Sequence, residues 1–279
     1  MKKFLTNRFN RYNLIASFFI ILVLILWVYP FIWLIFASFK LPLDLFKSGA
    51  SLLPKAWTLA NYARAWVQAR FSTYFINSVL YSVSATTLSV FIAGMCGYVL
   101  ARYTFPGSKL LYGLILSMLF LPAASSAVPI FELMRKLGLL NTPYAVILAM
   151  SGAGAFITLL FVGYFKNIPQ DMYDAAIVDG ANFLQQFWLV LPLAKPIIAT
   201  TVIFSFMGSW NDYFMPLIFT LSSPNLRTLA VGLRAFEGQY SFDWSGFAAA
   251  TVISILPIIV VFVLFQNYFV NGLSGAVKG

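Results

Sequence analysis

The segment Asp171–Pro196, DMYDAAIVDGANFLQQFWLVLPLAKP, differs in composition from the rest of the chain. Charged residues make up only 9% of the 279 residues and hydrophobic residues 61%, yet the segment brings together Asp171, Asp174 and Asp179. Long apolar runs precede and follow it. The segment is therefore predicted to leave the apolar environment that its flanking residues occupy.

The composition of the whole chain predicts that this environment is a membrane. Its mean hydropathy of +0.86 and its 61% of hydrophobic residues exceed the values of a soluble domain, in which about half of the residues are apolar. An apolar run of about 20 residues crosses a hydrocarbon core of about 30 Å as a helix. The apolar residues are continuous rather than alternating, which favours helices over a β-barrel. The predicted fold class is an all-α, polytopic membrane protein.

The apolar runs predict six transmembrane helices, at about 14–38, 72–101, 109–131, 143–165, 195–221 and 247–270. The first is expected to be a retained anchor, because no small-x-small cleavage site follows it. Basic residues are balanced between the two sides, but a dense cluster precedes the first run and predicts that both termini lie inside. Residues 171–196 then lie in the cytoplasm, between the fourth and fifth helices.

Several kinds of chemistry are excluded by the residue types. The chain has no histidine and a single cysteine, Cys96, which rules out an internal disulfide, a Cys/His metal site and a Ser–His–Asp triad. It contains no G-x-x-x-x-G-K-[ST] phosphate loop. The net charge of +10 is scattered between the apolar runs, which favours lipid head groups over nucleic acid as its partner. We therefore expect no catalytic residue and no metal site.

Residues 169–192 are predicted to form two short helices with a tight bend. Asp171 and Asp174 place negative charge near the positive N-terminal end of the first helix, and Gly180 can end it in a left-handed conformation. The second helix covers about 182–190, and one of its faces carries Phe183, Phe187 and Val190. Such a unit is either a docking element for a cytoplasmic partner or an interfacial helix pair on the lipid head groups.

The same residues resemble the EAA loop of ABC importer permeases. That loop reads Glu-Ala-Ala, three residues, a glycine, nine residues and an aliphatic-x-Leu-Pro ending. Here Asp174, Ala175 and Ala176 are followed by Gly180 and, near the expected spacing, by Pro192. Asp174 replaces the usual glutamate, which keeps the charge but shortens its reach. The form of the loop around Asp179 and Phe187 resembles that of carbohydrate importers.

Other segments extend the resemblance over nearly the whole chain past residue 70. They are FINSV at 75–79, LGLLNTPYAVIL at 137–148, WNDYFMPL at 210–217 and the terminal GLSGAVKG at 272–279, which is similar to the end of maltose-type permeases. The resemblance implies a type I ABC importer permease fold. It also implies an N-terminal anchor helix with an outer loop over 1–70, and a core transmembrane domain over 71–279 that carries the EAA loop at about 166–194.

The resemblance further implies a function, import of a sugar or oligosaccharide, and a set of partners. These are a second homologous permease subunit, two cytoplasmic ABC ATPase subunits and an extracytoplasmic sugar-binding protein that engages the outer loop at about 222–246. The complex would lie in a bacterial or archaeal cytoplasmic membrane. ATP and Mg²⁺ would be bound by the ATPase subunits, so this chain would hold no cofactor. Which sugar is carried stays open.

Three sets of site residues follow. The predicted ATPase-coupling residues are Asp174, Ala175, Ala176, Asp179, Gly180, Phe187 and Pro192. The predicted tail contacts with the ATPases are Gly275 and Lys278. The candidate substrate path consists of Trp210, Asn211, Asp212 and Tyr213, because an acid within a span is costly and aromatic rings stack on sugars; an aromatic belt at the membrane interface is the alternative. Helix packing, rather than helix breaks, is expected at Pro122, Pro129, Gly152 and Gly154.

Two rival functions need residues that this sequence does not supply in the expected number. An ion-coupled secondary carrier would require several ionisable residues within the spans, and Asp212 is the one acid predicted there. A prenyltransferase-like enzyme would use Asp171 and Asp174 with Mg²⁺, but it would need a second acid cluster facing them. The carrier is kept as the alternative to the importer permease.

Overall fold

The computed structural model describes residues 11–47, 51–152, 154–237 and 242–276. They form two compact units, the first made of residues up to 69 with 235–253 and the second of residues 70–234 with those from 254 onward. Both units are helical, and the strand-type pairing among the described residues is one antiparallel bridge between Glu237 and Phe242. The all-α fold class is thereby confirmed. The predicted division at residue 70 into anchor and core domains stays a prediction.

The first unit contains one long helix and several short ones. Its elements are α1 (Arg11–Ser38), α2 (Asp44–Lys47), α3 (Ala60–Ala63), the π-helical turn η1 (Arg64–Gln68) and the start of α14 (Trp244–Ala276). Residues 16–38 of α1 have a mean hydropathy of 2.8, and the most apolar stretch of 18 residues within them contains no buried residue. Exposing this much apolar surface to water would be unfavourable, so α1 is a helix that lipid or another protein covers.

Polar contacts fix the segment that follows α1 in the first unit. The buried Asn61 amide donates hydrogen bonds to the carbonyls of Ser38 (2.7 Å) and Lys40 (2.8 Å). Arg64 forms an ion pair of 3.1 Å with Asp243, whose other carboxylate oxygen accepts the Gly246 backbone N–H. These contacts close the connection between α1 and η1 onto the start of α14.

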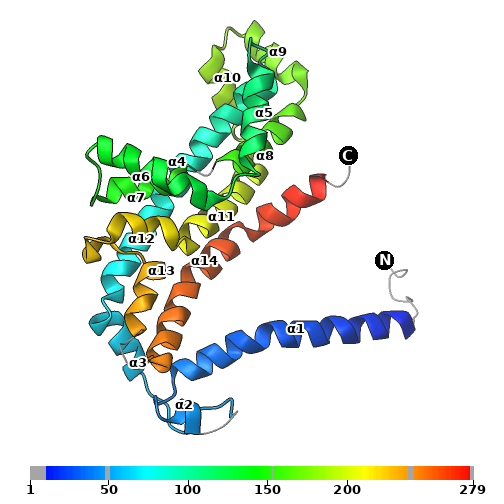
Figure 1. Cartoon of the computed structure of the whole chain (residues 1–279). Helices are drawn as coiled ribbons and strands as arrows, with labels where there is room; N and C mark the ends of the chain where they lie inside the picture. The colour runs from blue at the N-terminus through cyan, green and yellow to red at the C-terminus, as the bar shows by residue number, and fades with distance from the viewer. Residues whose placement is uncertain (1–10, 48–50, 153, 238–241, 277–279) are drawn as a thin grey trace. The chain divides into compact units, whose positions relative to one another are not determined.

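The second unit is built around α4 and contains the remaining elements (Figure 1). They are α4 (Phe71–Arg102), α5 (Ser108–Met118), the 3₁₀ turn η2 (Ala123–Ser126), α6 (Ala127–Lys136), α7 (Pro143–Ser151), α8 (Ala155–Lys166), α9 (Gln170–Val178), α10 (Phe183–Val190), α11 (Lys195–Asn211), α12 (Phe214–Thr220), η3 (Pro224–Leu226), α13 (Leu229–Gly232), η4 (Leu233–Phe236), which crosses into the first unit, and the rest of α14.

Helices α4 and α8 pack closely against each other in this unit. A Cβ atom added at Gly97 would lie 2.5 Å from the Phe161 Cβ and 3.1 Å from the Thr158 carbonyl oxygen. Small residues let helix backbones approach in membranes, where dispersion contacts replace the hydrophobic effect as the driving force. Two buried clusters result, one around Tyr81 with α6, α7 and α12, and one around Tyr98 with α8, α9 and α10.

The beginning of α4 holds a distant connection in place. The Asn77 amide donates hydrogen bonds to the carbonyls of Asn225 (2.7 Å) and Arg227 (3.0 Å). The Ser78 hydroxyl accepts the backbone N–H of Leu229 at 2.7 Å. The polar residues of the FINSV segment therefore pair with backbone groups at η3 and at the start of α13. Leaving such groups unpaired in an apolar environment would be unfavourable.

Three of the six predicted spans are continuous helices, and three are broken. Residues 16–38, 71–102 and 244–266 are each long and apolar enough to cross a membrane. The predicted span 109–131 is wrong as a single helix, because α5 ends at Met118 and Pro122 is extended (ψ 131°) before η2 and α6 begin. The span 143–165 is bent by 49° between α7 and α8. Counting each bent pair once gives up to five spans, and the count of six and the orientation stay predictions.

The expectation of helix packing at Gly152 and Gly154 is also wrong. These glycines lie where α7 gives way to α8, and a Cβ added to either would meet its nearest atom at an ordinary 3.7 Å. Pro122 likewise lies at a helix break. Pro129 does continue a helix, as the third residue of α6. Breaks and packing therefore occur at different residues, and close packing uses Gly97.

Candidate functional site

The predicted pair of short helices is present at residues 170–190. Helix α9 ends at Asp179, and Gly180 adopts a positive φ of 79°. The backbone N–H groups of Gly180 and Ala181 donate to the carbonyls of Ile177 (3.0 Å) and Ala176 (2.9 Å). This is the pattern of bonds that ends a helix with a left-handed glycine, so the predicted role of Gly180 in the bend is confirmed.

Helix α10 begins with a capping box that the sequence analysis missed. The Asn182 side chain accepts the Gln185 backbone N–H at 3.0 Å, and the Gln185 side chain accepts the Asn182 N–H at 2.7 Å. The N-x-x-Q spacing is the signal that could have revealed it. The chain then turns by 85° into α11, which begins at Lys195 with a proline in its first turn. Local hydrogen bonds thus fix the end of α9, the bend at Gly180 and the start of α10.

Aromatic side chains anchor the two helices to the C-terminal end of α4, where Figure 1 shows α9 and α10. Tyr98 of α4 is fully buried, and its ring centre lies 5.3 Å from that of Phe187, 5.5 Å from that of Phe183 and 6.2 Å from that of Tyr173. Aromatic contacts at these separations are each worth about 0.5–1.5 kcal/mol beyond their burial. These contacts therefore attach the helix pair to the C-terminal end of α4.

A chain of polar contacts runs beside this aromatic cluster. The Arg102 guanidinium lies 3.5 Å above the Tyr173 ring centre and donates a hydrogen bond to the Gln170 side-chain carbonyl. The Gln170 amide in turn donates to Asp174 Oδ1 at 2.8 Å. Burial raises the pKa of the Tyr173 phenol above its ordinary value of 10.0, against the opposing effect of Arg102. The carboxylate of Asp174 is thus oriented by residues that the sequence analysis did not single out.

The coupling residues predicted from the sequence divide into an exposed and a buried group. Asp174, Ala175, Asp179, Gly180 and Pro192 are exposed. Ala176 and Phe187 are 6% and 2% exposed, and Phe187 belongs to the cluster that packs on α4. Apolar side chains also stand outside this cluster, and they are Ile177, Val178, Leu184, Trp188 and Leu189, of which Val178 is 87% exposed. The outer surface of α9 and α10 therefore combines carboxylates with uncovered apolar groups.

The candidate substrate-path residues lie at a second helix break. Helix α11 ends at Asn211, and Asp212 is extended (ψ 118°) before α12 begins. The carboxylate of Asp212 accepts the backbone N–H of Met215, in the first turn of α12, at 3.2 Å. Trp210 is 4% exposed, stacks on Phe206 and donates its indole N–H to the Ser254 carbonyl at 2.9 Å. Asn211 bonds to its own helix, and Tyr213 lies 5.6 Å from the Arg234 guanidinium.

Asp212 lines a cavity of about 310 Å³ together with hydroxyl groups from two helices. Its polar lining residues are Ser89 of α4 and Ser205 and Ser209 of α11, and the rest of the lining is Met150, Phe156, Ile157, Phe204 and Gly208. The Ser89 hydroxyl donates to the carbonyl of Ser151, the last residue of α7. The cavity thus lies beside the break between α7 and α8 and the break between α11 and α12. It offers hydroxyl and carboxylate groups to a polar solute.

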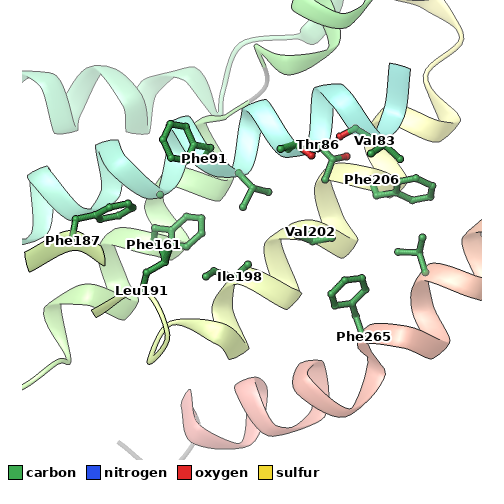
Figure 2. Close-up of a pocket in the computed structure, with 14 residues that line it drawn as sticks. Val83, Thr86, Phe91, Phe161, Phe187, Leu191, Ile198, Val202, Phe206 and Phe265 are labelled. Atoms are coloured by element: carbon green, nitrogen blue, oxygen red, sulfur yellow. Dashed lines mark hydrogen bonds between the residues drawn. The ribbon is translucent and has the colours of Figure 1, made fainter. Parts of the chain in front are cut away.

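A second cavity, of about 380 Å³, is apolar. Figure 2 shows Phe91, Phe161 and Phe206 around it, with Phe187 and Leu191 at one end and Phe265 of α14 at the other. Its polar lining groups are the hydroxyls of Thr86 and Thr87. This lining suits hydrocarbon rather than a solute that carries many hydroxyl groups.

The predicted C-terminal contact residues lie at the limit of the described part of the chain. Gly275 lies within α14, and Lys278 lies outside the described residues. In the part of the chain that the structure describes, no group of three or more Asp, Glu or Cys side chains is placed to hold a metal ion.

Comparisons with known proteins give a consistent result. Residues 89–275 match the family described as binding-protein-dependent transport system inner membrane component. The chain is 35% identical over 260 residues to the diacetylchitobiose uptake system permease protein of Streptomyces coelicolor, covering 90% of this chain and 85% of that protein. It is 32% identical over 265 residues to the trehalose/maltose transport system permease protein of Thermococcus litoralis, covering 93% and 94%. A crystal structure of a bacterial ABC transporter involved in the import of the acidic polysaccharide alginate is similar with a TM-score of 0.82 and 25% identity, covering 94% of this chain and 98% of that chain.

Proposed function

The chain belongs to the family of inner-membrane components of binding-protein-dependent transport systems, and from that premise we propose that it forms half of the path by which an ATP-driven importer takes up a sugar or oligosaccharide. It is a multi-pass membrane protein, and permeases of this family work with ATPases and a binding protein. The alternative of an ion-coupled secondary carrier has no support in the comparisons and is set aside.

The single observation that carries the proposal is the outward surface of α9 and α10. Asp174, Gly180 and the apolar Val178 are exposed on it, while Phe187 ties it to the buried ring of Tyr98. An uncovered apolar patch beside carboxylates is typical of a protein interaction site. We expect a cytoplasmic ATPase to cover it, so that movement of the ATPase is passed to α4 as a rigid-body displacement.

The solute is proposed to pass the cavity at Asp212. Its volume of about 310 Å³ lies at the lower end of the range of small-molecule sites. Serine hydroxyls and a carboxylate can exchange hydrogen bonds with sugar hydroxyls. In membrane proteins, broken helices are tolerated where they line a cavity, and such breaks mark the binding sites of many transporters.

The remaining partners follow from the same proposal. A second homologous permease would complete the path, two ATPase subunits would bind ATP and Mg²⁺, and an extracytoplasmic sugar-binding protein would deliver the solute. The most apolar stretch of α1, in which no described residue is buried, is proposed to face lipid and the second permease. No cofactor is assigned to this chain, and no residue in it is given a catalytic role.

The test is purification of the tagged chain from its native membranes in mild detergent, followed by an assay of MgATP hydrolysis. We expect the wild type to bring ATPase activity with it, and Gly180→Trp to lose that activity while the permease stays folded. A Cβ atom added at Gly180 meets no atom within 4 Å, but any side chain there must adopt a positive φ of 79°, so Gly180→Asn, which tolerates that φ, is the matched control. An intact wild type without any ATPase would refute the proposal.

A further inference from the structure

We propose that Arg102 is a positioning residue of the coupling segment, which joins the end of α4 to α9 through Gln170 and Tyr173 and so fixes Asp174 at the surface. This inference rests on the proposed function, because it concerns the contact between Asp174 and the ATPase. Neither the resemblance nor the spacing of the motif includes Arg102, which lies far outside the loop in sequence.

A hydrogen-bond relay connects Arg102 to Asp174 through the side chain of Gln170. Arg102 is the last residue of α4, and Gln170 is the first residue of α9. The carbonyl of the Gln170 side chain accepts from the Arg102 guanidinium, and its amide nitrogen donates to Asp174 Oδ1 at 2.8 Å. Both ends of this amide are therefore engaged with charged groups, and hydrogen bonds to charged groups are stronger than those between neutral ones. The amide transmits the position of Arg102 to the carboxylate.

Arg102 also stacks on an aromatic ring of α9. The same guanidinium lies 3.5 Å above the ring centre of Tyr173, which is 3% exposed. The Tyr173 ring is in turn stacked on Tyr98 of α4, with an interplanar angle of 29°. Arginine can offer its face to a ring and its edge to an amide at the same time, whereas lysine is a point charge that serves one partner well. The geometry therefore requires arginine rather than any cation.

The exposure of Asp174 explains how the relay would affect binding of a partner. Its side chain is exposed, and among the described residues its carboxylate forms no ion pair. An exposed, freely rotating carboxylate would lose side-chain entropy on binding a partner. The bond from Gln170 removes much of that loss beforehand and leaves the second carboxylate oxygen for the partner. Without Arg102, Gln170 would be free to rotate and Asp174 would lose its orientation.

The variants are chosen to separate position from charge and from folding. Arg102→Ala removes both contacts, Arg102→Lys keeps the charge, and Gln170→Ala breaks the relay while leaving the stacked ring. Lys109→Ala is the matched control, because Lys109 is an exposed cation in the first turn of α5, outside the coupling segment. It removes the same charge as Arg102→Ala.

The measurement uses the permease complex in lipid nanodiscs and the ATPase that co-purifies with the wild type as the probe. We would measure the Kd of this ATPase for the permease, the MgATP turnover of the ATPase at saturation and the Tm of the permease. Arg102→Ala is expected to raise the Kd about tenfold, with Arg102→Lys and Gln170→Ala lying between it and the wild type. Lys109→Ala is expected to match the wild type, and the Tm of Gln170→Ala is expected to stay unchanged.

Three outcomes would overturn the inference. An unchanged Kd in Gln170→Ala would show that the relay does not act on the contact, and this variant decides the matter even if Arg102→Ala fails to fold. A lower Tm with an unchanged Kd in Arg102→Ala would show a structural role alone. An equal loss of affinity in Lys109→Ala would show an effect of charge alone. If no ATPase binds the wild type, the proposed function fails first, and that result is distinct from the other three.

Discussion

The Ser89 hydroxyl of α4 donates a hydrogen bond of 2.8 Å to the carbonyl of Ser151, the last residue of α7. Where a helix ends inside a membrane protein, its final carbonyls need partners because no water is present to serve them. Ser89 supplies one of these partners and also lines the cavity that contains Asp212. The helix break and the polar cavity are therefore parts of one arrangement, which makes the cavity the strongest candidate for the solute path.

Filling this cavity is expected to stop uptake without stopping assembly. Ser209 lines the cavity and is 7% exposed, so Ser209→Leu would place a larger apolar group where a solute hydroxyl would bind. We expect uptake of the sugar on which the host depends through this system to fall at least about tenfold, as loss of a hydrogen-bonded contact and of volume implies. Transport assays in whole cells would measure it, beside MgATP hydrolysis by the purified complex.

The control for this change is Ser117→Leu, which makes the same substitution at an exposed position of α5. It should leave uptake close to that of the wild type. Normal uptake by Ser209→Leu, in protein made at the normal level, would remove the cavity from the path.

Enlarging Gly97 is expected to separate α4 from α8. Because an added Cβ would already lie 2.5 Å from the Phe161 Cβ and close to the α8 backbone, Gly97→Leu should cost about 1–3 kcal/mol or more of folding free energy. Thermal unfolding in detergent, followed by size-exclusion chromatography, would report a lower Tm. Gly113→Leu makes the same change where nothing lies within 4 Å and should not lower the Tm. Equal Tm values for the two variants would contradict the packing.

The raised pKa of Tyr173 makes a prediction about alkaline pH. Burial raises this pKa above 10.0 in the folded protein, so the phenol loses its proton more readily in the unfolded chain. The stability that it contributes is complete below about pH 10 and is lost as the pH rises further. Tyr173→Phe should therefore lose less Tm than the wild type between pH 8 and about pH 10.5. A larger loss in the variant would contradict the burial of an ionisable phenol there.

The sequence predicted the helix ends in the coupling segment well, because they depend on local chemistry. Gly180 ends α9 through its own backbone freedom, and Phe187 faces inward because its helix has one apolar face. The relay through Arg102 could not be predicted, because α4 and α9 are brought together by the packing of Tyr98. The resemblance to importer permeases supplied the partners, which no property of single residues would have given.

The broken helices were missed for a different reason. Apolar composition is the same on both sides of Gly152 and of Asp212, so hydropathy alone continues the span through each break. At these breaks side chains pair with backbone groups: Ser89 bonds the Ser151 carbonyl at the end of α7, and Asp212 bonds the Met215 N–H at the start of α12. The Ser89 contact joins segments far apart in the chain, and the Asp212 contact lies where one helix gives way to the next. Hydrophobic periodicity detects neither of them.

The measurement that most directly tests the docking of α9 and α10 on an ATPase is photo-cross-linking from Val178 in native membranes. A photoreactive phenylalanine analogue at this position, which is 87% exposed, would be compared with the same analogue at Val263 of α14, which is 53% exposed. Val178 is predicted to give a covalent adduct with a cytoplasmic ATP-binding protein, and Val263 is predicted to give none. Labelling of lipid alone from Val178, in intact protein, would contradict the account and show that the two helices lie on the membrane surface.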